Sequence, residues 1–148
     1  MNDQAIATTV RVNRPAKDAF AAINDPRAWW GVEIDGEMSH VGDEWTYRYK
    51  DFHVSKQRVS ELVPNKRIVW DVVEANLTFI ADGGEWTGTR IVFDLAEADG
   101  ATEIRFAHEG LGPDCECFNA CSGAWTGLVG RSLKSLIETG RGFPDQVG

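Results

Sequence analysis

Apolar and polar residues alternate along most of the chain, and this period of two is typical of half-buried β-strands. The alternating segments cover residues 6–12, 32–37, 44–50, 54–63, 67–74, 89–98 and 101–109, with 32–37 the weakest. Residues 77–80 either extend the strand before them past a bulge or form a short strand of their own. The pattern predicts six or seven strands. Their shared apolar face is expected to carry Trp45, Tyr47, Tyr49, Ile68, Trp70, Val72, Ile91, Phe93, Leu95, Ile104, Phe106 and His108.

Two other stretches repeat their apolar residues at spacings of three and four, as amphipathic helices do. Asn13 is expected to cap a first short helix, with Pro15 in its first turn and residues 24–26 as its end. One more helical turn is expected at 27–30. A single long helix is predicted over 114–139, on the stripe Phe118, Cys121, Trp125, Leu128, Ser132 and Leu136.

The glycines of the long helix, Gly123, Gly127 and Gly130, lower its intrinsic stability by up to about 1 kcal/mol each relative to alanine. Their presence suggests a helix face that another backbone approaches closely. Gly140 and Gly142, with Pro144, are typical of the end of a helix.

Short turns such as Asp99-Gly100 join the predicted strands, so the strands are expected to pair as antiparallel hairpins. The apolar face of such a sheet must be covered, and the long helix is the only predicted element of sufficient length. The sequence therefore predicts an α+β fold. In it, a curved antiparallel sheet of six or seven strands wraps a long C-terminal helix, with short helices after the first strand. A strongly curved sheet leaves a space beside the helix in which a small molecule can lie.

The composition is that of a globular protein, with 148 residues, 43% of them hydrophobic and 26% charged. A single domain spanning 1–148 is expected. The formal charge of −8 counts against partners such as nucleic acid or an anionic membrane surface. No apolar run approaches the ~18 residues of a membrane span, and the first residues lack the pattern of a signal peptide. We therefore expect a cytoplasmic protein whose three cysteines are thiols.

The aromatic residues are numerous, with six Trp, seven Phe and two Tyr, and each can bury about 150–250 Å². A single ring of this kind is ordinary core, but the whole set favours an apolar cavity with a few placed polar groups. The residues expected to bind a ligand there are Trp30, Trp45, Tyr47, Tyr49, Trp70, Phe93, Phe106, His108, Phe118, Cys121 and Trp125.

Among the histidines, His108 is expected to point inward, because it shares a strand face with Ile104 and Phe106. It is predicted either to anchor a ligand or act as a general base, or simply to hydrogen-bond to the start of the long helix. His40 and His53 lie in turn-like contexts and are expected in solvent.

The cysteines, Cys115, Cys117 and Cys121, contain no CxxC pair, and His108 could join them only if the connecting loop folded back. No metal site is therefore expected. Cys117 and Cys121 are predicted to share a helix face as buried thiols. Cys115 is nearest the helix start and is the expected reactive thiol, because a helix N-terminus lowers the pKa of a thiol.

The carboxylates Glu33, Asp35 and Glu37 alternate on a short segment and are interpreted as keeping an edge strand in solvent. Glu61 and Asp71 lie within strand patterns, where either is a candidate to face inward and pair with Arg48, Arg58 or Arg90; strand parity alone does not decide. The chain has no phosphate-binding loop, no dinucleotide-binding glycine motif and no Gly-x-Ser-x-Gly elbow. No cofactor is expected.

Several stretches match the pattern of one known superfamily: residues 10–16, 19–20, 29–30, 66–70, 102–111, 121–125, 132–134 and 138–140. On these residues the chain resembles the START-like, or SRPBCC, helix-grip superfamily. Within it, the chain resembles the activators of the ATPase of the ninety-kilodalton heat-shock protein. The resemblance covers nearly the whole chain and implies the helix-grip fold. Its members include lipid binders, aromatic cyclases, hormone receptors and chaperone regulators, so it implies no single activity. Eukaryotic chaperone activators add an N-terminal domain, for which this chain is expected to have no room.

Three functions are consistent with these observations. The first is binding of a small hydrophobic or aromatic molecule between sheet and helix, without catalysis. The second is an interaction module that contacts a chaperone or a second copy through exposed Trp29 and Trp86. The third is a cyclase or hydrolase that uses the cavity with His108 or Cys115.

Overall fold

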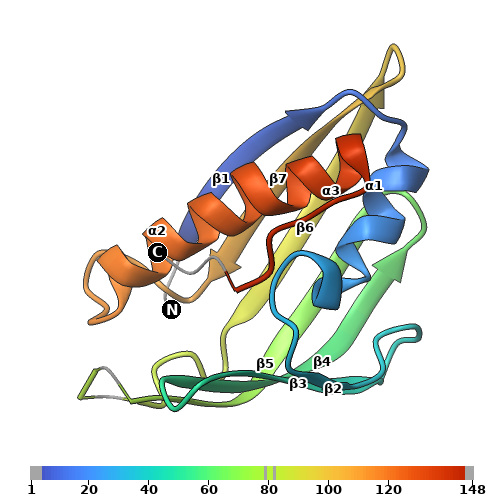
Figure 1. Ribbon diagram of the computed structural model, residues 1–148. Coiled ribbons are helices and arrows are strands. Elements are labelled where there is room, and N and C mark those ends of the chain that lie inside the picture. Colours follow the sequence, from blue (N-terminus) through green and yellow to red (C-terminus); the bar gives the residue numbers. More distant parts are fainter. Residues whose placement is uncertain (1–4, 79, 82, 146–148) are drawn as a thin grey trace.

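The computed structural model describes residues 5–78, 80–81 and 83–145. Within these residues, seven strands form one antiparallel sheet in the order β1-β7-β6-β5-β4-β3-β2 (Figure 1), which confirms the α+β prediction. The short β2 and the N-terminal β1 are its two edges. The strands are β1 Ala5–Val12, β2 Ile34–Gly36, β3 Glu44–Tyr49, β4 His53–Val63, β5 Arg67–Leu77, β6 Arg90–Ala98 and β7 Ala101–Glu109.

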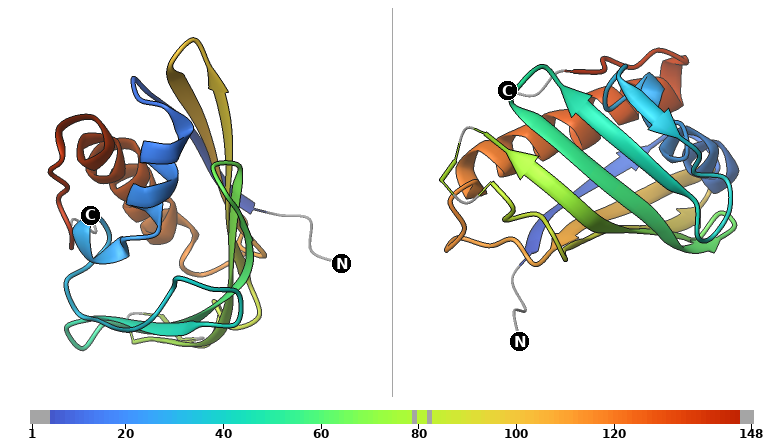
Figure 2. Two further views of the ribbon diagram at one scale, coloured as in Figure 1. Left: turned by 90° about the vertical axis from the view of Figure 1, so that its right-hand side faces the viewer. Right: turned by 90° about the horizontal axis from the view of Figure 1, so that it is seen from below.

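The sheet bends around the C-terminal helix, which lies on its concave side (Figure 2). The register of β4 against β5 shifts between Lys56 and Gln57 and again between Val59 and Glu61. Such bulges increase the local twist and bend of a sheet. The Asp99-Gly100 hairpin is confirmed, with φ values of 55° and 77° in the left-handed region that this tight turn requires. β5 runs through Leu77, while Phe79 lies outside the described residues.

The long helix is continuous but not uniform. It consists of α2 (Phe118–Gly127), a π-helical segment (Leu128–Leu133) and α3 (Lys134–Thr139). It begins four residues later than the sequence predicts, because residues 114–117 form turns ahead of it. The carboxylate of Glu85 accepts the backbone N–H groups of Glu116 and Cys117 at 2.8 and 3.0 Å, which satisfies donors at the start of the helix.

The prediction that glycines mark a closely packed helix face is wrong at two positions. A Cβ atom added to Gly123 or Gly130 would meet no described atom within 4 Å. These glycines therefore face open space, and the close approach of helix and sheet occurs on the opposite side, at Cys121, Trp125 and Leu128.

The first helix, α1 (Ala16–Ile23), is followed by a 3-10 turn at Pro26–Ala28. The expected cap at Asn13 is wrong, since Pro15 occupies the N-cap position and no side chain caps from there. Instead, Glu97 of β6 accepts the N–H of Ala16 at 2.7 Å. The N–H of Asn13 donates to Glu138 of α3 at 2.9 Å, which ties the segment between β1 and α1 to the C-terminal helix.

The π-helical segment turns Ser132 into the protein interior, where it is fully buried. Its hydroxyl donates to the carbonyl of Trp29 and accepts the N–H of Phe143, both at 2.7 Å. This one side chain thereby joins the helix, the 3-10 turn and the C-terminal segment, and it fixes the start of the Trp29-Trp30 pair. No helix of the described residues is both long and apolar enough to cross a bilayer.

Candidate functional site

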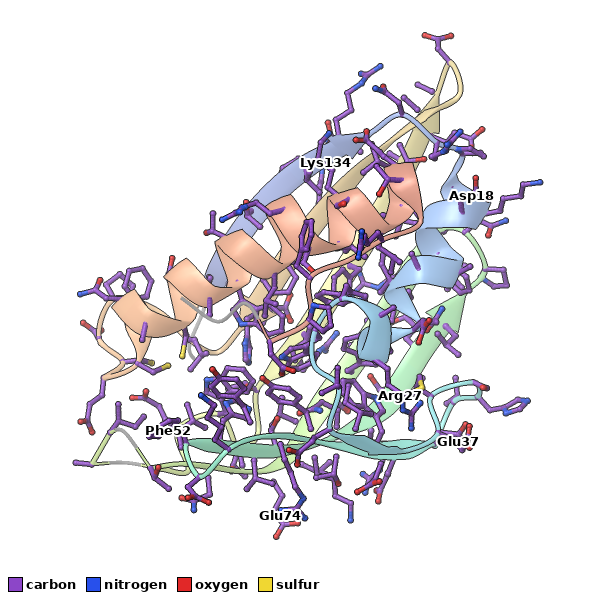
Figure 3. All side chains as sticks on the ribbon, in the orientation of Figure 1. Asp18, Arg27, Glu37, Phe52, Glu74 and Lys134 are labelled. Atoms are coloured by element: carbon purple, nitrogen blue, oxygen red, sulfur yellow. The ribbon has the colours of Figure 1, made fainter. Side chains whose placement is uncertain are left out.

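A half-open cavity of about 250 Å³ lies between the β3–β4 hairpin and α2, with Trp30 and Trp86 among its other walls. Figure 3 shows Phe52 at the end of the sheet beneath α2, whereas Glu74 points away from the helices. Phe52 is about half exposed, at 51%, and so lies where the cavity meets solvent. The lining residues are Trp30, Tyr47, Tyr49, Phe52, His53, Trp86, Ala120, Cys121, Ala124, Trp125 and Leu128.

Two sequence features create this space. The period of two on β3 turns Tyr47 and Tyr49 toward the helix, where their rings form the floor. On α2, Ala120 and Ala124 lie one turn apart on the face above that floor and present only methyl groups. Bulky rings opposite small side chains leave a gap that larger helix residues would close.

The inner wall is built around Trp30, which is 1% exposed. Its ring lies 4.8 Å from that of Tyr47, 4.9 Å from Trp125 and 5.3 Å from Trp45, measured between centroids. Rings at these separations, tilted or edge-to-face, stabilise one another beyond simple burial. Trp30 follows the 3-10 turn Pro26–Ala28 directly, and the hydroxyl of Ser132 binds the carbonyl of its neighbour Trp29, which holds this segment against the helix.

A packed row of aromatic side chains continues behind this wall. Trp45, Trp70, Phe93 and Phe106 have successive centroid separations of 4.9, 5.3 and 5.3 Å, and Phe106 lies 4.6 Å from Trp125. All four are buried, and they belong to the core.

His108 is fully buried behind Trp86 and Trp125 and is not part of the cavity wall. Its Nδ1 accepts the indole N–H of Trp125 at 3.0 Å, and its Nε2 lies 2.8 Å from the hydroxyl of Thr89. That hydroxyl donates to the carbonyl of Trp86, so Nε2 of His108 must carry the proton.

The same contacts determine what His108 does. Burial lowers its pKa to about 3, so the ring is neutral at pH 7, and both nitrogens are already hydrogen-bonded. His108 therefore holds Trp86 and Trp125 in place rather than meeting a ligand or taking up a proton. The predicted bond to the start of the helix is instead a bond to Trp125, well inside α2.

His53 is a cavity residue that the sequence analysis placed in solvent, and that prediction is wrong. It is the first residue of β4 and lies between the rings of Tyr47 and Trp86, with centroids at 5.0 and 4.6 Å. Its Nε2 is 2.9 Å from the hydroxyl of Ser55. Burial lowers the pKa of His53 to about 4. Strand parity was the missed signal, since His53 alternates in phase with the buried Ser55 and Gln57. His40, in contrast, is exposed as predicted.

The cysteines are free thiols in three different environments. Cys121 lines the cavity, and its sulfur accepts the indole N–H of Trp86 at 3.4 Å. Cys117, one turn earlier, is fully buried, whereas Cys115 is partly exposed with its sulfur 3.9 Å from the carbonyl of Gly110. Hydrogen bonding from the Cys117 thiol lowers the pKa of Cys121 and raises that of Cys117. Within the described ranges no three His, Cys, Asp or Glu side chains group as metal ligands.

The carboxylates singled out in the sequence are not among the residues that line the cavity. Glu33, Asp35 and Glu37 are exposed on or beside the edge strand β2. On the other strands, Glu44 binds Arg58 at 2.6 Å, Glu61 lies 3.3 Å from Arg67, and Asp71 lies 3.9 Å from Arg90. Asp71 thus lies near Arg90, one of the three predicted partners, whereas the partner of Glu61 is Arg67, which the prediction did not include.

Of the predicted ligand-binding residues, five meet at the cavity: Trp30, Tyr47, Tyr49, Cys121 and Trp125. The other six lie outside its lining: Trp45, Trp70, Phe93, Phe106, His108 and Phe118. Six further lining residues were not predicted: Phe52, His53, Trp86, Ala120, Ala124 and Leu128. Trp86, expected to be exposed, is 4% exposed, and Trp29 is fully buried, so the predicted aromatic protein contact is wrong.

The chain matches one protein family over most of its length and is similar in fold to several solved structures. Residues 13–138 match the family model described as activator of Hsp90 ATPase homolog 1-like protein. The solution structure of the Aha1 dimer from Colwellia psychrerythraea is similar, with 24% identity, a TM-score of 0.75, and coverage of 93% of this chain and 98% of that one. Protein SSP2350 from Staphylococcus saprophyticus has 18% identity, a TM-score of 0.70, and coverage of 95% and 96%.

A third similar structure is DynU16, from the dynemicin biosynthetic locus, with 19% identity and a TM-score of 0.70. The match covers 95% of this chain but 49% of DynU16. No protein with a curated description matches the chain. At these identities the structural matches establish the fold alone.

Proposed function

Because the chain belongs to the activator of Hsp90 ATPase homolog 1-like family and its own fold leaves a space between sheet and helix, we propose that it binds a small, uncharged aromatic or apolar molecule in this space. The cavity itself carries the proposal, since its volume of about 250 Å³ is lined mainly by aromatic rings and small apolar side chains. An engineered apolar cavity of about 150 Å³ in another protein holds benzene. The present cavity therefore suits a substituted ring or two fused rings.

The charge of the walls favours a neutral ligand. None of the described lining residues is Lys, Arg, Asp or Glu. Burial lowers the pKa of His53 to about 4 and raises that of Tyr47, so both side chains are uncharged near pH 7. An ion in this cavity would lose its hydration without gaining a partner of opposite charge, which is costly.

Tryptophan fluorescence tests the proposal, because Trp30, Trp86 and Trp125 line the cavity. We expect 2-naphthol to change the emission saturably and 2-naphthoate, its charged analogue, to leave it unchanged. Ala124→Leu should abolish the 2-naphthol response by filling the cavity. Ala21→Leu, on the exposed face of α1, is the matched control and should bind as the native chain does. Absence of a saturable response, or equal binding by Ala124→Leu, would overturn the proposal.

Regulation of a chaperone or self-association is the second candidate. It is favoured by the family's description and by the dimer formed by the similar Colwellia protein. The two residues predicted to contact a partner, Trp29 and Trp86, are buried. They therefore offer no exposed surface to a chaperone or to a second copy of the chain. Catalysis through His108 is not favoured, since both ring nitrogens are engaged.

A further inference from the structure

Several polar atoms of the residues that line the cavity are not offered to a ligand. The indole N–H of Trp86 donates to the sulfur of Cys121 at 3.4 Å, and that of Trp125 donates to His108 at 3.0 Å. The hydroxyl of Tyr47 is fully buried, so it does not face the open space. Recognition of a polar ligand group therefore depends on another side chain of the wall.

His53 differs from these residues, because one of its ring nitrogens is both unpaired and accessible. Its Nε2 lies 2.9 Å from the hydroxyl of Ser55. Its Nδ1 has no hydrogen bond to a described residue, yet it is not one of the fully buried polar atoms that lack a partner. The ring itself belongs to the cavity wall, between the rings of Tyr47 and Trp86. Nδ1 is thus available to a molecule that enters the cavity.

Ser55 determines which nitrogen of His53 carries the proton. Its side chain is 1% exposed, and among the described residues its hydroxyl has no hydrogen-bond partner other than Nε2 of His53. If Nε2 carried the proton, it would donate to the serine oxygen, and the buried hydroxyl proton would have no acceptor, which is unfavourable. The hydroxyl therefore donates to Nε2. Burial lowers the pKa of His53 to about 4, so the ring is neutral at pH 7 and its single proton lies on Nδ1.

We propose that the cavity selects uncharged aromatic compounds that carry a hydrogen-bond-accepting oxygen, such as aryl ketones, and that Nδ1–H of His53 donates to this oxygen. This inference deepens the proposed function and rests on it, because the compound must first enter the cavity. A carbonyl oxygen that leaves water for an apolar site loses its hydrogen bonds unless the site supplies a donor. A hydrocarbon of the same shape needs no donor, so His53 matters for the ketone alone.

A matched pair of ligands isolates this hydrogen bond. 1-Indanone carries a ketone on two fused rings, and indane has nearly the same shape without the oxygen. NMR titrations at pH 7, followed on the indole N–H signals of the protein, would give both dissociation constants. His53→Phe keeps a ring but removes the donor. In this variant we expect the affinity for 1-indanone, relative to that for indane, to fall about tenfold from its value in the native chain.

Three further variants locate the effect. His40→Phe makes the same substitution at a side chain that is 85% exposed, and it should leave both affinities unchanged. Tyr49→Phe removes a hydroxyl from another lining residue, and it should leave the ratio of the two affinities unchanged. Ser55→Ala removes the hydroxyl that orients the proton of His53, so it should lower this ratio, though less than His53→Phe does.

Two spectroscopic signals distinguish a hydrogen bond from a change in packing. The nitrogen-15 shifts of the His53 ring report which nitrogen is protonated, and they need no ligand. We expect Nδ1 to be protonated and Nε2 to be unprotonated in the native chain. The infrared carbonyl stretch of bound 1-indanone should lie at a lower wavenumber in the native protein than in His53→Phe, because a hydrogen bond to the oxygen weakens the C=O bond.

The outcomes separate this inference from the proposed function. If both compounds bind and His53→Phe leaves the ratio of their affinities unchanged, selection by His53 is overturned and the binding function stands. A ratio that falls in Tyr49→Phe but not in His53→Phe would overturn it in the same way. A proton on Nε2 instead of Nδ1 in the native chain would refute the assigned donor. If neither compound binds, the proposed function fails, and this inference fails with it.

Discussion

The indole N–H of Trp125 donates to Nδ1 of His108 across 3.0 Å, and this hydrogen bond ties the middle of α2 to strand β7 behind the cavity. On the other side of the imidazole, Nε2 donates to Thr89, whose hydroxyl donates to the carbonyl of Trp86. Two walls of the cavity are thus held by one neutral histidine. Buried networks in which every member is satisfied give rigid, specific packing.

Replacement of this histidine should destabilise the fold. His108→Phe keeps a ring but leaves the N–H of Trp125 without an acceptor and Thr89 without its donor. With about 1–3 kcal/mol for each buried group left unpaired, we expect the free energy of unfolding to fall by about 2–5 kcal/mol. Urea denaturation would measure it. His40→Phe, at a side chain that is 85% exposed, is the control and should change stability little.

Stability should fall on mild acidification. The unfolded chain takes up a proton at each histidine near pH 6.5, whereas the folded protein does so at His53 only near pH 4 and at His108 only near pH 3. Protons therefore favour the unfolded state throughout pH 6.5 to 4, and the full stability is present above pH 6.5. As the pH falls through this range, His53 and His108 should each lower the free energy of unfolding by up to about 1.4 kcal/mol per pH unit.

Denaturation curves at pH 7.5, 6.5, 5.5 and 5.0 would measure this slope. The His108→Phe variant should retain about half of it, because His53 still titrates. A free energy of unfolding that stays constant from pH 7.5 to 5.0 would show that these imidazoles are accessible to solvent.

Replacing Gln57 with leucine should make the folded protein more stable. Its side chain is fully buried on the inner face of β4, and neither its amide nitrogen nor its amide oxygen has a hydrogen-bond partner among the described residues. Gln57→Leu keeps a similar volume and removes both polar atoms. We expect a gain of about 1–3 kcal/mol in urea denaturation. A loss of similar size would instead mean that the amide is hydrogen-bonded in solution.

Two glycine substitutions should have opposite effects. Gly123→Ala places its Cβ in open space on α2 and should stabilise the protein by about 0.5–1 kcal/mol through helix propensity. Gly31→Ala would place its Cβ 2.8 Å from Cδ1 of Tyr47, whose buried ring cannot move aside freely. Crowding of this kind destabilises by about 1–3 kcal/mol. Thermal denaturation of both variants would reveal the difference in sign.

Gly31→Ala also tests the cavity, because Tyr47 forms part of its floor. We expect this variant to bind 2-naphthol more weakly, whereas Gly123→Ala should bind it as the native chain does. Equal affinity of both variants would contradict the position assigned to Tyr47.

Several features followed from local patterns along the chain. Alternation on residues 44–50 and 101–109 correctly placed Trp45, Tyr47, Phe106 and His108 on the inner face of the sheet. The Asp99-Gly100 turn and the long amphipathic helix were predicted for the same reason, since each depends on neighbours within one or two turns of the backbone. Strand period, helix period and turn preference are local properties, so the fold class was within reach of the sequence.

The lining of the cavity could not be predicted from the sequence, because it depends on contacts between distant segments. Trp86 lies in a loop without periodicity, and its burial results from packing against His53, His108 and Trp125 of three other elements. The π-helical segment Leu128–Leu133 likewise has no signature in local spacing, although helical spacing did place Ser132 on the inward stripe. Residue patterns along this chain specify which side chains face inward, whereas the bend of the sheet and the placement of its loops select those that enclose free space.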